Sequence, residues 1–493
     1  MLLEWRQRTN VDNSVHPPTD IPMVIWEWLA TRGVTSHQQV ENLRRASLKT
    51  LKSPFVIKGM EKAVSRIISA LDNAESICIY GDFDMDGTPA VAILYKGLES
   101  LGFKNLSYYQ PSRLDEGYGL HSTVLKKLKH EGINLVITVD LGITAVAEAD
   151  LAQDLSLDLI ITDHHLPGEK IPNAYAVINP NQQDCPSELG YLSGTGVAFY
   201  LLMAIKQKMT ERGYPLNNFN AKKFVDLFAL GTIADMVPLQ GDNRPLVKHG
   251  LIQLAKTEHL GLRELLKSLD LWGRPLHSSD VAMKLAPSLN ALSRLELDTR
   301  PIEILLCQNK EKAIALSQQA QKTNQLRKDL QQKAYLIAKD KLSEVPPNHF
   351  IYVASEKFHK GVIGLVATKL MQEYNLPTFV GYIHTGKVIG SSRAPEENTA
   401  IDLTRVLAGA SRALTKFGGH KLAAGFELEQ DSQDIFITLL EEQFSESLRS
   451  SESANELIYD VEVNLSELNP LTMKWLDEFE PYGKDFSPPL FRI

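Results

Sequence analysis

The sequence predicts an α/β protein in which a parallel-sheet domain is joined by long helices to a smaller α/β domain. Three observations predict this fold class. From about residue 57 to 240, short apolar runs with β-branched residues alternate with amphipathic helical stretches, which is typical of parallel strands joined by crossover helices. Residues 300–343 are rich in Gln, Lys and Ala and contain no Gly or Pro after Pro301, which favours helix. A second alternation of strand-like and helical runs extends from about 350 to 445.

The length of the chain bounds the number of domains. A chain of 493 residues is too long for one hydrophobic core, so we expect about two to four domains. The helical stretch is either a spacer between domains or a helix packed on the first domain. The predicted boundaries are residues 1–55 for an N-terminal extension, 56–270 for the first α/β domain, 271–344 for a helical connector, 345–447 for the second α/β domain and 455–493 for the start of a β-domain.

Composition and charge exclude several classes of protein. The net charge of −8, from 60 acids and 52 bases, argues against a protein that coats nucleic acid with its whole surface, although a local basic groove stays compatible with it. Cys78, Cys185 and Cys307 are odd in number and far apart, which is typical of a reducing compartment. The N-terminus has charged residues and no apolar core, and no apolar run approaches the roughly 18–20 residues that span a bilayer. We therefore expect a cytoplasmic protein.

Acidic residues and histidines follow three of the predicted strands, at the point where each strand ends. The strands are ESICIY (75–80), INLVITV (133–139) and LDLIIT (157–162). Because the carboxyl ends of parallel strands lie along one edge of a sheet, where open α/β folds bind their ligands, we expect the following side chains to cluster there. They are Asp82, Asp84 and Asp86 after the first strand, Asp140 after the second, and Asp163, His164 and His165 after the third.

Such a cluster of carboxylates needs a source of positive charge. Repulsion between like charges raises carboxylate pKa values and opposes folding, and bound cations offset that cost. A single aspartate after a strand is usually a turn residue or a helix N-cap. Three alternating aspartates on one loop exceed what one helix start uses, and the other two strand ends repeat the acidic pattern. The pattern therefore predicts a metal site.

The ligand types indicate which metal the site binds. Carboxylates with one or two imidazoles and no thiolate suit Mn²⁺ or Mg²⁺ better than structural zinc. A site this rich in anions is expected to hold two ions. Two metal ions about 3.5–4 Å apart promote in-line phosphoryl displacement, so the residues by themselves predict phosphoester hydrolysis.

The loops GDFDMDG (81–87), TVDLG (138–142) and TDHH (162–165) resemble the motifs of the DHH phosphoesterase superfamily. Within the superfamily, the chain from about residue 20 to its C-terminus is similar to bacterial 5′-to-3′ exonucleases specific for single-stranded DNA. The resemblance implies a metal-dependent exonuclease of DNA repair and recombination that releases 5′-mononucleotides. Further segments carry it in order and at similar spacing: PSRLDEGYGL (111–120), VINPNQQDC (177–185), GTGVAFY (194–200), ALGTIADMVPL (229–239), NALSRL (290–295), FHKGVIGLVA (358–367), GSSRAP (390–395) and FGGHKLAAG (417–425).

The resemblance also implies roles for the residues at the sheet edge. Asp140 is expected to bridge the two ions, and Asp163 and His165 to act as ligands, orienting groups or stabilisers of the transition state. By itself, Asp235 is explained equally well as an ordinary acid between a helix and a loop. The implied metal ligands are Asp82, Asp84, Asp86, Asp140, Asp163, His164 and Asp235, and the implied catalytic set is Asp84, Asp86, Asp140, His164 and His165.

Candidate nucleic-acid contacts combine cations, an aromatic ring and glycines. Arg113 and Tyr118 lie on a Gly-rich loop, where a guanidinium can grip a phosphate and a ring can stack on a base for about 1–3 kcal/mol. The resemblance implies that Ser391 and Arg393 in the second domain bind the 5′-terminal phosphate. Without the resemblance, a surface arginine is usually only solvated and a Gly-Gly pair is usually a turn. The remaining candidates are Asn290, Arg294, His359, Gly418, Gly419 and His420.

A few positions depart from the pattern of the proteins that the chain resembles. Pro89 stands between Thr88 and Ala90 just after the acidic loop. Proline is tolerated in the first turn of a helix, so the fold should survive, while a hydroxyl near the metals is expected to be missing. Ser288 replaces an arginine expected beside the site, which should weaken phosphate contacts. Other replacements are Leu141, where Asn or Cys is usual, and Phe358 and Lys360.

The resemblance further implies that residues 455–493 begin an oligonucleotide-binding (OB-like) β-barrel without completing it, so we expect weaker DNA affinity and processivity. Expected partners of this monomer are single-stranded DNA with a 5′ end, a single-strand-binding protein and a helicase. A catalytically weakened DNA-binding scaffold is an alternative function, indicated by Pro89, Leu141 and Ser288, although all expected ligands are present. A phosphodiesterase of short oligonucleotides or cyclic dinucleotides is another, although the long connector favours long DNA.

Overall fold

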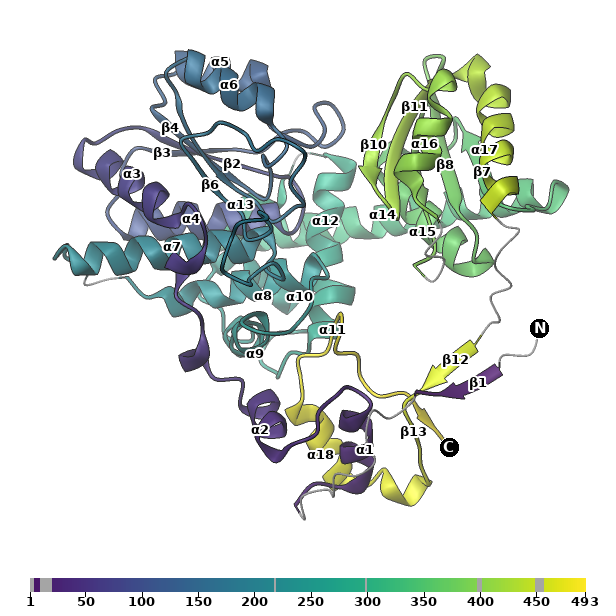
Figure 1. Cartoon of the computed structure of the whole chain (residues 1–493), viewed down its shortest axis with the longest axis horizontal. Coiled ribbons are helices and arrows are strands. Elements are labelled where there is room, and N and C mark those ends of the chain that lie inside the picture. The colour runs from purple at the N-terminus through teal and green to yellow at the C-terminus, as the bar shows by residue number, and fades with distance from the viewer. Residues whose placement is uncertain (1–3, 9–19, 217–218, 298, 397–400, 448–455) are drawn as a thin grey trace. The chain divides into compact units, whose positions relative to one another are not determined.

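The computed structural model describes residues 4–8, 20–216, 219–297, 299–396, 401–447 and 456–493 (Figure 1). Part of the predicted N-terminal extension and residue 455 lie outside these ranges. The chain divides into two compact units: the first unit comprises residues 1–321 and 455–493, and the second unit comprises residues 322–454. Within the described residues, no helix is both long enough and apolar enough to cross a membrane.

The first unit is built on a five-stranded parallel sheet, which confirms the predicted fold class. Its strand order is β3-β2-β4-β5-β6. Three of its strands, β2, β4 and β5, coincide with the three predicted runs, and every residue of β2 and β4 is buried, as expected for strands covered on both faces. The strands are β2 (Ile77–Gly81), β3 (Leu106–Tyr109), β4 (Leu135–Val139), β5 (Asp158–Thr162) and β6 (Ala176–Ile178).

Alternate residues of the central strands pack into two cores, because successive side chains of a strand point to opposite faces. In β2, Ile77 and Ile79 enter the larger core with α3, α4, α7 and α8, whereas Cys78 and Tyr80 enter a smaller core with α5 and α6. Figure 1 shows α5 and α6 on the other side of the sheet from α3 and α4. These helices are α3 (Met60–Asp72), α4 (Gly87–Ser100), α5 (Ser122–His130), α6 (Val146–Asp154), α7 (Gly194–Glu211) and α8 (Val225–Ala234).

Helices continue the first unit beyond α8. The predicted helical stretch is confirmed, since α14 is one helix of 35 residues that begins in the first unit and ends in the second. A π-helical segment, Val281–Leu285, links α11 to α12. The helices are α9 (Asn243–Leu254), α10 (Leu260–Ser268), α11 (Ser278–Asp280), α12 (Ala286–Leu295), α13 (Pro301–Leu306) and α14 (Lys310–Glu344).

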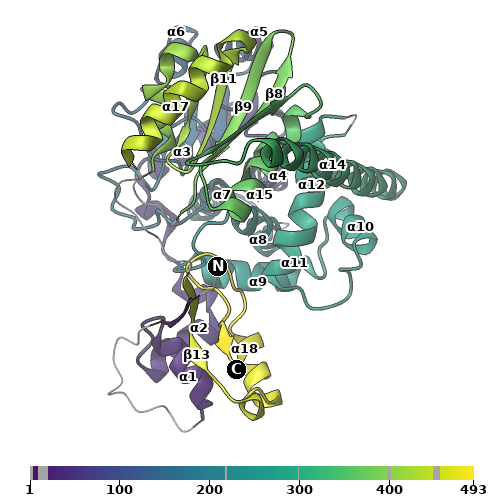
Figure 2. The same ribbon diagram turned by 90° about the vertical axis from the view of Figure 1, so that its right-hand side faces the viewer.

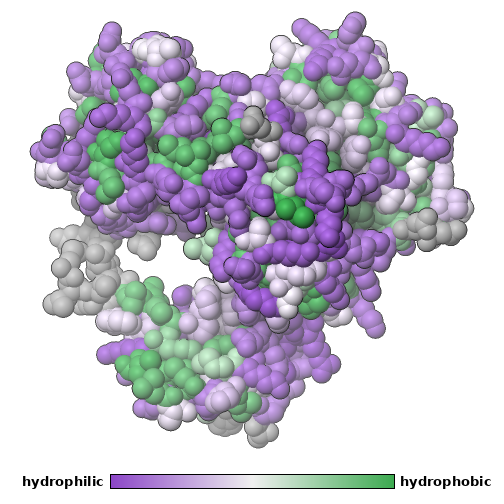
Figure 3. All heavy atoms as spheres, turned by 180° about the vertical axis from the view of Figure 1, so that it is seen from behind, coloured by the Kyte–Doolittle hydropathy of each residue, from purple (hydrophilic) through white to green (hydrophobic). Residues whose placement is uncertain are grey.

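The two ends of the chain share one core, which the sequence analysis had treated as two separate pieces. We name the described residues 4–8, 20–45 and 456–493 the terminal module; its core includes Trp28, Phe479 and Phe486 (Figures 1 and 2). Figure 3 shows apolar side chains on the surface of this module. The start of an OB-like barrel in this region stays a prediction. The elements are β1 (Glu4–Gln7), paired in parallel with β12 (Glu456–Tyr459), β13 (Val461–Glu462), paired with β14 (Phe491–Arg492), α1 (Met23–Ala30), α2 (His37–Arg45) and α18 (Pro470–Glu478).

The second unit is a smaller α/β fold around a mixed five-stranded sheet, also as predicted. Its strand order is β10-β11-β9-β8-β7, and only β7 and β8 pair in parallel within this sheet. Phe379, Phe426 and Phe436 fill its core. The elements are β7 (Ile351–Ser355), α15 (Ile363–Tyr374), β8 (Thr378–His384), β9 (Lys387–Arg393), α16 (Leu403–Gly409), β10 (Lys416–His420), β11 (Ala423–Glu429) and α17 (Gln433–Ser447).

Candidate metal centre

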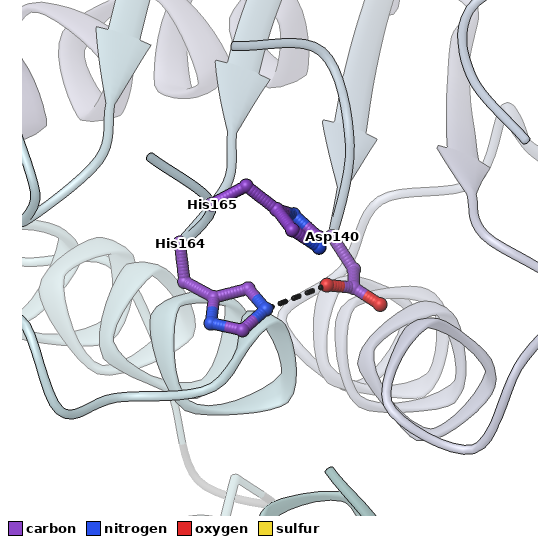
Figure 4. Close-up of side chains that lie close together, drawn as sticks. All are labelled: Asp140, His164 and His165. Atoms are coloured by element: carbon purple, nitrogen blue, oxygen red, sulfur yellow. Dashed lines mark ion pairs between the residues drawn. The ribbon is translucent and has the colours of Figure 1, made fainter. Parts of the chain in front are cut away.

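Three neighbouring strands of the first sheet deliver acids and histidines to one place. The loops after β2, β4 and β5 carry the predicted residues, and these strands are adjacent in the sheet. Figure 4 shows Asp140, His164 and His165 at the carboxyl ends of the strands. Asp235, at the end of α8, joins them. Three groups have ligand atoms within 4.8 Å of one another: Asp82, Asp84 and Asp140; Asp86, His164 and Asp235; and Asp140, His164 and His165.

His164 lies at the centre of this cluster. Its Nε2 atom is 3.2 Å from Asp140 Oδ1, 3.6 Å from Asp86 Oδ2 and 3.7 Å from Asp235 Oδ2. Because this nitrogen faces three carboxylates, a cation bound beside it could be shared by the imidazole and the carboxylates. Asp140 and His164 each belong to two of the three groups, so they join the groups into one continuous site.

The acids of the cluster are buried beside one another. Burial, followed by the charges of Asp86 and Asp84, raises the pKa of Asp140 well above its ordinary value. Burial and the charge of Asp84 do the same for Asp82. The pKa of Asp235 rises to about 9, because of burial first and the charge of Asp86 second. The cluster is therefore unfavourable as a set of bare carboxylates.

Three carboxylate oxygens of the cluster lack a hydrogen-bond partner, within the described part of the chain. They are Asp82 Oδ1, Asp140 Oδ1 and Asp235 Oδ2, and all three are buried. A buried oxygen without a partner is costly, whereas a divalent cation would satisfy it directly. Oxygen-rich donors with an imidazole fit Mn²⁺ or Mg²⁺, so the residues present fit the predicted metals.

Two of the loop aspartates also hold helix ends. Asp84 Oδ1 accepts hydrogen bonds from the backbone N–H groups of Asp86 (2.8 Å) and Gly87 (3.0 Å), at the start of α4. The Asp86 carboxylate accepts from the N–H groups of Gly194 (2.6 Å) and Thr195 (2.8 Å), at the start of α7. A carboxylate has about four lone-pair sites, so these bonds leave room for a metal.

Asp163 has a different environment from the other acids. Its Oδ1 accepts a hydrogen bond from His165 Nδ1 at 2.7 Å, and its Oδ2 accepts from the N–H of Ile143 at 2.9 Å. Burial acts to raise its pKa, but the hydrogen bond and charge of His165 hold the pKa below its ordinary value. Asp163 belongs to none of the three converging groups. This geometry favours an orienting role toward His165 over the expected ligand role.

The loop between β3 and α5 closes over the cluster. The Tyr118 hydroxyl lies 3.3 Å from His165 Nδ1 and 3.4 Å from the backbone oxygen of Asp140. The Arg113 guanidinium lies 4.8 Å above the Phe83 ring, and its Nη1 is buried without a hydrogen-bond partner among the described residues. Both predicted side chains of this loop therefore lie beside the acidic loop.

The predicted contacts of the second unit lie on its sheet, except for His359, which lies just before α15. Arg393 Nη1 donates to Ser391 Oγ at 2.9 Å, and His359 Nδ1 accepts from the N–H of Gly361 just before α15. A Cβ at Gly364, in the first turn of α15, would be 3.1 Å from Arg393 Nη2 and 3.2 Å from Ser391 Oγ. The start of α15 thus packs directly against Ser391 and Arg393.

Cross-strand register places the glycine motif beside these residues. His420 pairs with Ala423 and Ala423 with Arg393, while Gly418 pairs with Gly425 and Gly425 with Ser391. Residues in register share a face of the sheet. Gly419 has a φ of +145°, and a Cβ there would lie 2.5 Å from the Cα of Ala424, so the position requires glycine.

Comparison with known proteins decides the family. The sequence matches the model of the DHH family, N-terminal domain, over residues 76–232 and that of the DHHA1 domain over residues 348–446. It is 32% identical to the single-stranded-DNA-specific exonuclease RecJ of Escherichia coli over 499 residues, which cover 98% of this chain and 85% of that protein. The chain belongs to the RecJ family.

Other RecJ proteins are similar to this chain in sequence and in fold. The RecJ protein of Bacillus subtilis is 31% identical over 490 residues, which cover 98% of this chain and 60% of that protein. The crystal structure of Thermus thermophilus RecJ in complex with Mn²⁺ superposes with a TM-score of 0.81 at 28% identity, covering 99% of this chain and 69% of that chain. The structure of the same protein in complex with Mg²⁺ gives a TM-score of 0.73 at 26% identity, with 99% and 68% covered.

The departures from the RecJ pattern have visible local consequences. Pro89 lies in the first turn of α4, which forms as expected, and the Thr88 hydroxyl accepts a hydrogen bond from Gln110 at 3.0 Å. Leu141 is fully buried in the smaller core. Ser288 is also buried, and its hydroxyl donates to the backbone oxygen of Lys284 at 2.7 Å, so it points along its own helix.

The two nucleic-acid contacts predicted on α12, Asn290 and Arg294, lie in the first unit. Asn290 is half-buried, and its Oδ1 has no hydrogen-bond partner among the described residues. Arg294 is also half-buried. Their contact with nucleic acid stays a prediction.

Sequence reasoning missed residues that shape the site. Gln110 donates to the backbone oxygen of Asp82 (2.5 Å), so it braces the acidic loop of the RecJ fold. Glu296 accepts hydrogen bonds from Ser112 Oγ (2.7 Å) and from the N–H of Arg113, so it holds the loop that carries Arg113. Gln110 follows β3, and the rule used for the other strand ends would have found it. Glu296 has no comparable signal, because it lies 183 residues from Arg113.

Proposed function

We propose that this RecJ family member is a metal-dependent exonuclease of single-stranded DNA that digests from the 5′ end and releases 5′-mononucleotides. The observation that carries the proposal is the cluster of buried carboxylates around His164, with three buried oxygens that lack hydrogen-bond partners among the described residues. The curated relatives that bear the name RecJ are single-stranded-DNA-specific exonucleases, and that of Thermus thermophilus binds Mn²⁺ and Mg²⁺.

The proposed cofactor is a pair of Mn²⁺ or Mg²⁺ ions. Asp140 would bridge them, because it belongs to one group with Asp82 and to another with His164. When bound, the ions supply Lewis-acid catalysis, which neutralises the phosphate and lowers the pKa of water. The residues that would hold them are Asp82, Asp84, Asp86, Asp140, His164 and Asp235.

The remaining residues of the site position the reacting groups. Asp163 fixes the orientation of the His165 ring through the 2.7 Å hydrogen bond to Nδ1. The same bond therefore fixes the direction in which the opposite edge of the ring faces. Asp86 is fixed in turn by the N–H groups at the start of α7. Arg113 supplies a guanidinium for phosphate beside the acidic loop.

The second unit is proposed to hold the 5′ end. Arg393 and Ser391 lie together against the start of α15, and N–H groups at a helix start favour an anion. A bidentate guanidinium and a hydroxyl suit a terminal phosphate, which has more free oxygens than a phosphodiester. His359, Gly418, Gly419 and His420 would complete this phosphate and strand contact.

The experiment that tests the proposal uses a 5′-phosphorylated single-stranded oligonucleotide labelled at either end. Wild-type protein should release mononucleotides from the 5′ end with Mn²⁺ or Mg²⁺ and release nothing with EDTA. Asp84→Ala and Asp140→Ala should abolish release while retaining the circular dichroism of the wild type. A folded wild-type protein that binds the strand without hydrolysing it in either metal would refute the nuclease and support the scaffold.

A length series separates the proposal from the alternative phosphodiesterase. Hydrolysis should be more efficient on strands of tens of nucleotides than on dinucleotides or cyclic dinucleotides. The reverse order would establish a phosphodiesterase of short substrates.

We further propose a monomer that works in the cytoplasm on strands exposed by a helicase and presented with a single-strand-binding protein. An exonuclease that needs a free single strand depends on an activity that separates the duplex. Pull-down of these two proteins with the purified chain would test this set of partners.

A further inference from the structure

Two large apolar side chains stand in solvent, each one residue away from the metal cluster. Leu166 follows His165 and is 75% exposed, and Met236 follows Asp235 and is 70% exposed. Large apolar side chains gain free energy by leaving water, although single exposed ones are ordinary on protein surfaces. Exposure alone therefore does not indicate a role, whereas the position of both residues and the backbone of Met236 do.

The two residues flank the same cluster. His164 Nε2 lies 3.7 Å from Asp235 Oδ2, so the loop after β5 and the loop after α8 meet at this contact. Leu166 lies on the first loop, next to His165. The half-exposed Tyr118 ring also lies beside His165, and the centroids of these two rings are 5.7 Å apart. Met236 leaves the second loop next to Asp235. The cluster thus has an apolar side chain beside each of these two loops.

The backbone of Met236 adds an independent observation. Its φ is +59°, in the left-handed region, and its N–H closes the last turn of α8 by donating to the backbone oxygen of Ile233 at 3.2 Å. Glycine or asparagine normally occupies the left-handed position after a helix, because other side chains are strained there. A methionine at this strained position, directly after a member of the metal cluster, is less favourable for folding than glycine or asparagine, which points to a role for its exposed side chain.

We propose that Leu166 and Met236 form, with Tyr118, an apolar rim that contacts the nucleosides on the two sides of the scissile phosphate. The proposal rests on the proposed function. A phosphodiester held by the cluster is covalently joined to a nucleoside on each side, so the neighbouring nucleosides must lie beside the cluster, close to the loops that carry these exposed side chains. The contact is expected with the bases of these nucleosides, because bases present flat, largely apolar faces and contact without hydrogen bonds is tolerant of sequence.

The test compares an ordinary 5′-phosphorylated oligonucleotide with one that is abasic at its first two positions. Met236→Gly, Met236→Asn and Leu166→Ser should lower kcat/KM on the ordinary strand by about ten- to hundredfold, the range expected for loss of a buried Leu or Met side chain. On the abasic strand the three variants should match the wild type. Met236→Gly should also raise the thermal midpoint, because it removes strain, and the stabilisation of each variant by Mn²⁺ should equal that of the wild type.

Leu465→Ser provides the matched control, since Leu465 is 70% exposed on the terminal module, and it should alter neither substrate. Equal losses on both strands, or no loss on either, would overturn the rim. Fluorescence anisotropy with the same two strands in Ca²⁺ reads binding without dependence on turnover. A wild-type chain that binds but never cleaves would refute the nuclease alone, and the rim would then stand or fall on whether the variants weaken binding of the ordinary strand only.

Discussion

Single residues of the centre carry backbone strain and a like-charge repulsion that metal binding would offset. Asp140 has a left-handed backbone (φ +63°), is almost fully buried and faces four other carboxylates. A non-glycine residue in this region costs roughly 1–3 kcal/mol, and strain of this kind gathers at functional sites. The metal-free protein carries both the strain and the repulsion, so folding and metal binding are coupled.

Asp140→Asn should make the metal-free protein more stable while removing its response to metal. Loss of one buried charge should raise the free energy of unfolding by about 1 kcal/mol, the scale of one pKa unit of like-charge repulsion. The rise in thermal midpoint with Mn²⁺ should shrink, and DNA hydrolysis should fall by at least about a hundredfold. Thermal unfolding with and without Mn²⁺ measures both stability effects. A less stable variant with an unchanged response to Mn²⁺ would contradict the repulsion account.

Helices place some of the ligands as much as the loops do. The start of α7 donates two N–H groups to Asp86, and its first residue packs directly on Asp140. A Cβ on Gly194 would lie 2.4 Å from Asp140 Oδ1. A helix start that both binds one acid and touches another fixes the distance between them.

Gly194→Ala should therefore weaken metal binding without altering any ligand. The added methyl group must displace the Asp140 carboxylate, and displaced ligands typically cost on the order of 10–100-fold in metal affinity. Calorimetric titration with Mn²⁺ measures this loss. Gly168→Ala is the control, because its nearest neighbour, Thr144 Cγ2, would be 4.0 Å from the new Cβ. Equal Mn²⁺ affinity in both variants would show that Gly194 does not position Asp140.

A buried ion pair joins α8 to the segment before α10. His259 Nε2 lies 3.6 Å from Asp226 Oδ1, and Thr257 Oγ1 donates to Asp226 Oδ2. Burial lowers the pKa of His259, but the charge and hydrogen bond of Asp226 outweigh it and hold the pKa above its ordinary value, despite an opposing effect of Lys96. The folded state therefore binds this proton more tightly than the unfolded state.

The pair should make stability depend on pH in a defined direction. Its stabilisation is fully present below the pKa of the unfolded histidine, near 6.5, and is lost as pH rises through the higher pKa of the folded state. The difference in unfolding free energy between wild type and His259→Gln should be largest near pH 6, at roughly 1–3 kcal/mol, and smaller at pH 9. Urea denaturation at the two pH values measures it, and a difference that grows with pH would exclude this ion pair as the cause.

At the scale of the whole first unit, two cations of α9, Lys248 and the buried Arg244, fasten the terminal module; Lys248 Nζ donates to the backbone oxygens of Arg44 and Glu478, both at 2.6 Å. Arg244, on α9, donates to the backbone oxygens of Leu43 (3.2 Å), Phe479 (2.5 Å) and Pro481 (3.1 Å). These three carbonyls come from both ends of the module. One side chain thus satisfies groups more than 400 residues apart in the chain.

Arg244→Ala should loosen the terminal module. Loss of the guanidinium leaves buried carbonyls unsatisfied and should cost about 2–4 kcal/mol. Limited proteolysis should then cut the chain between α2 and α3 sooner than in the wild type. Arg274→Ala is the matched control, because Arg274 makes a half-exposed pair with Asp280 that should contribute only about 0–1 kcal/mol. Equal rates of cleavage in both variants would show that Arg244 does not fasten the module.

The sequence by itself determined the sheet and most of the cluster. The runs before Asp82, Asp140 and His164 are short, apolar and alternate with helical stretches, which favours strands of a buried parallel sheet, and such strands bring their carboxyl ends together. That geometry makes the convergence of their side chains predictable from the order of residues alone. The motifs that carry the family resemblance indicate the same residues as members of the site.

Only the tertiary structure decided what depends on packing between distant segments. Asp163 is hydrogen-bonded to His165, and Glu296 holds a loop 183 residues away, whereas the approach of Asp235 to His164 had support only from the family resemblance. The core that the two chain ends share also depends on packing between distant segments. Local pattern reports how a segment folds, whereas these contacts depend on which segments the hydrophobic cores bring side by side, and no single stretch of sequence contains that information.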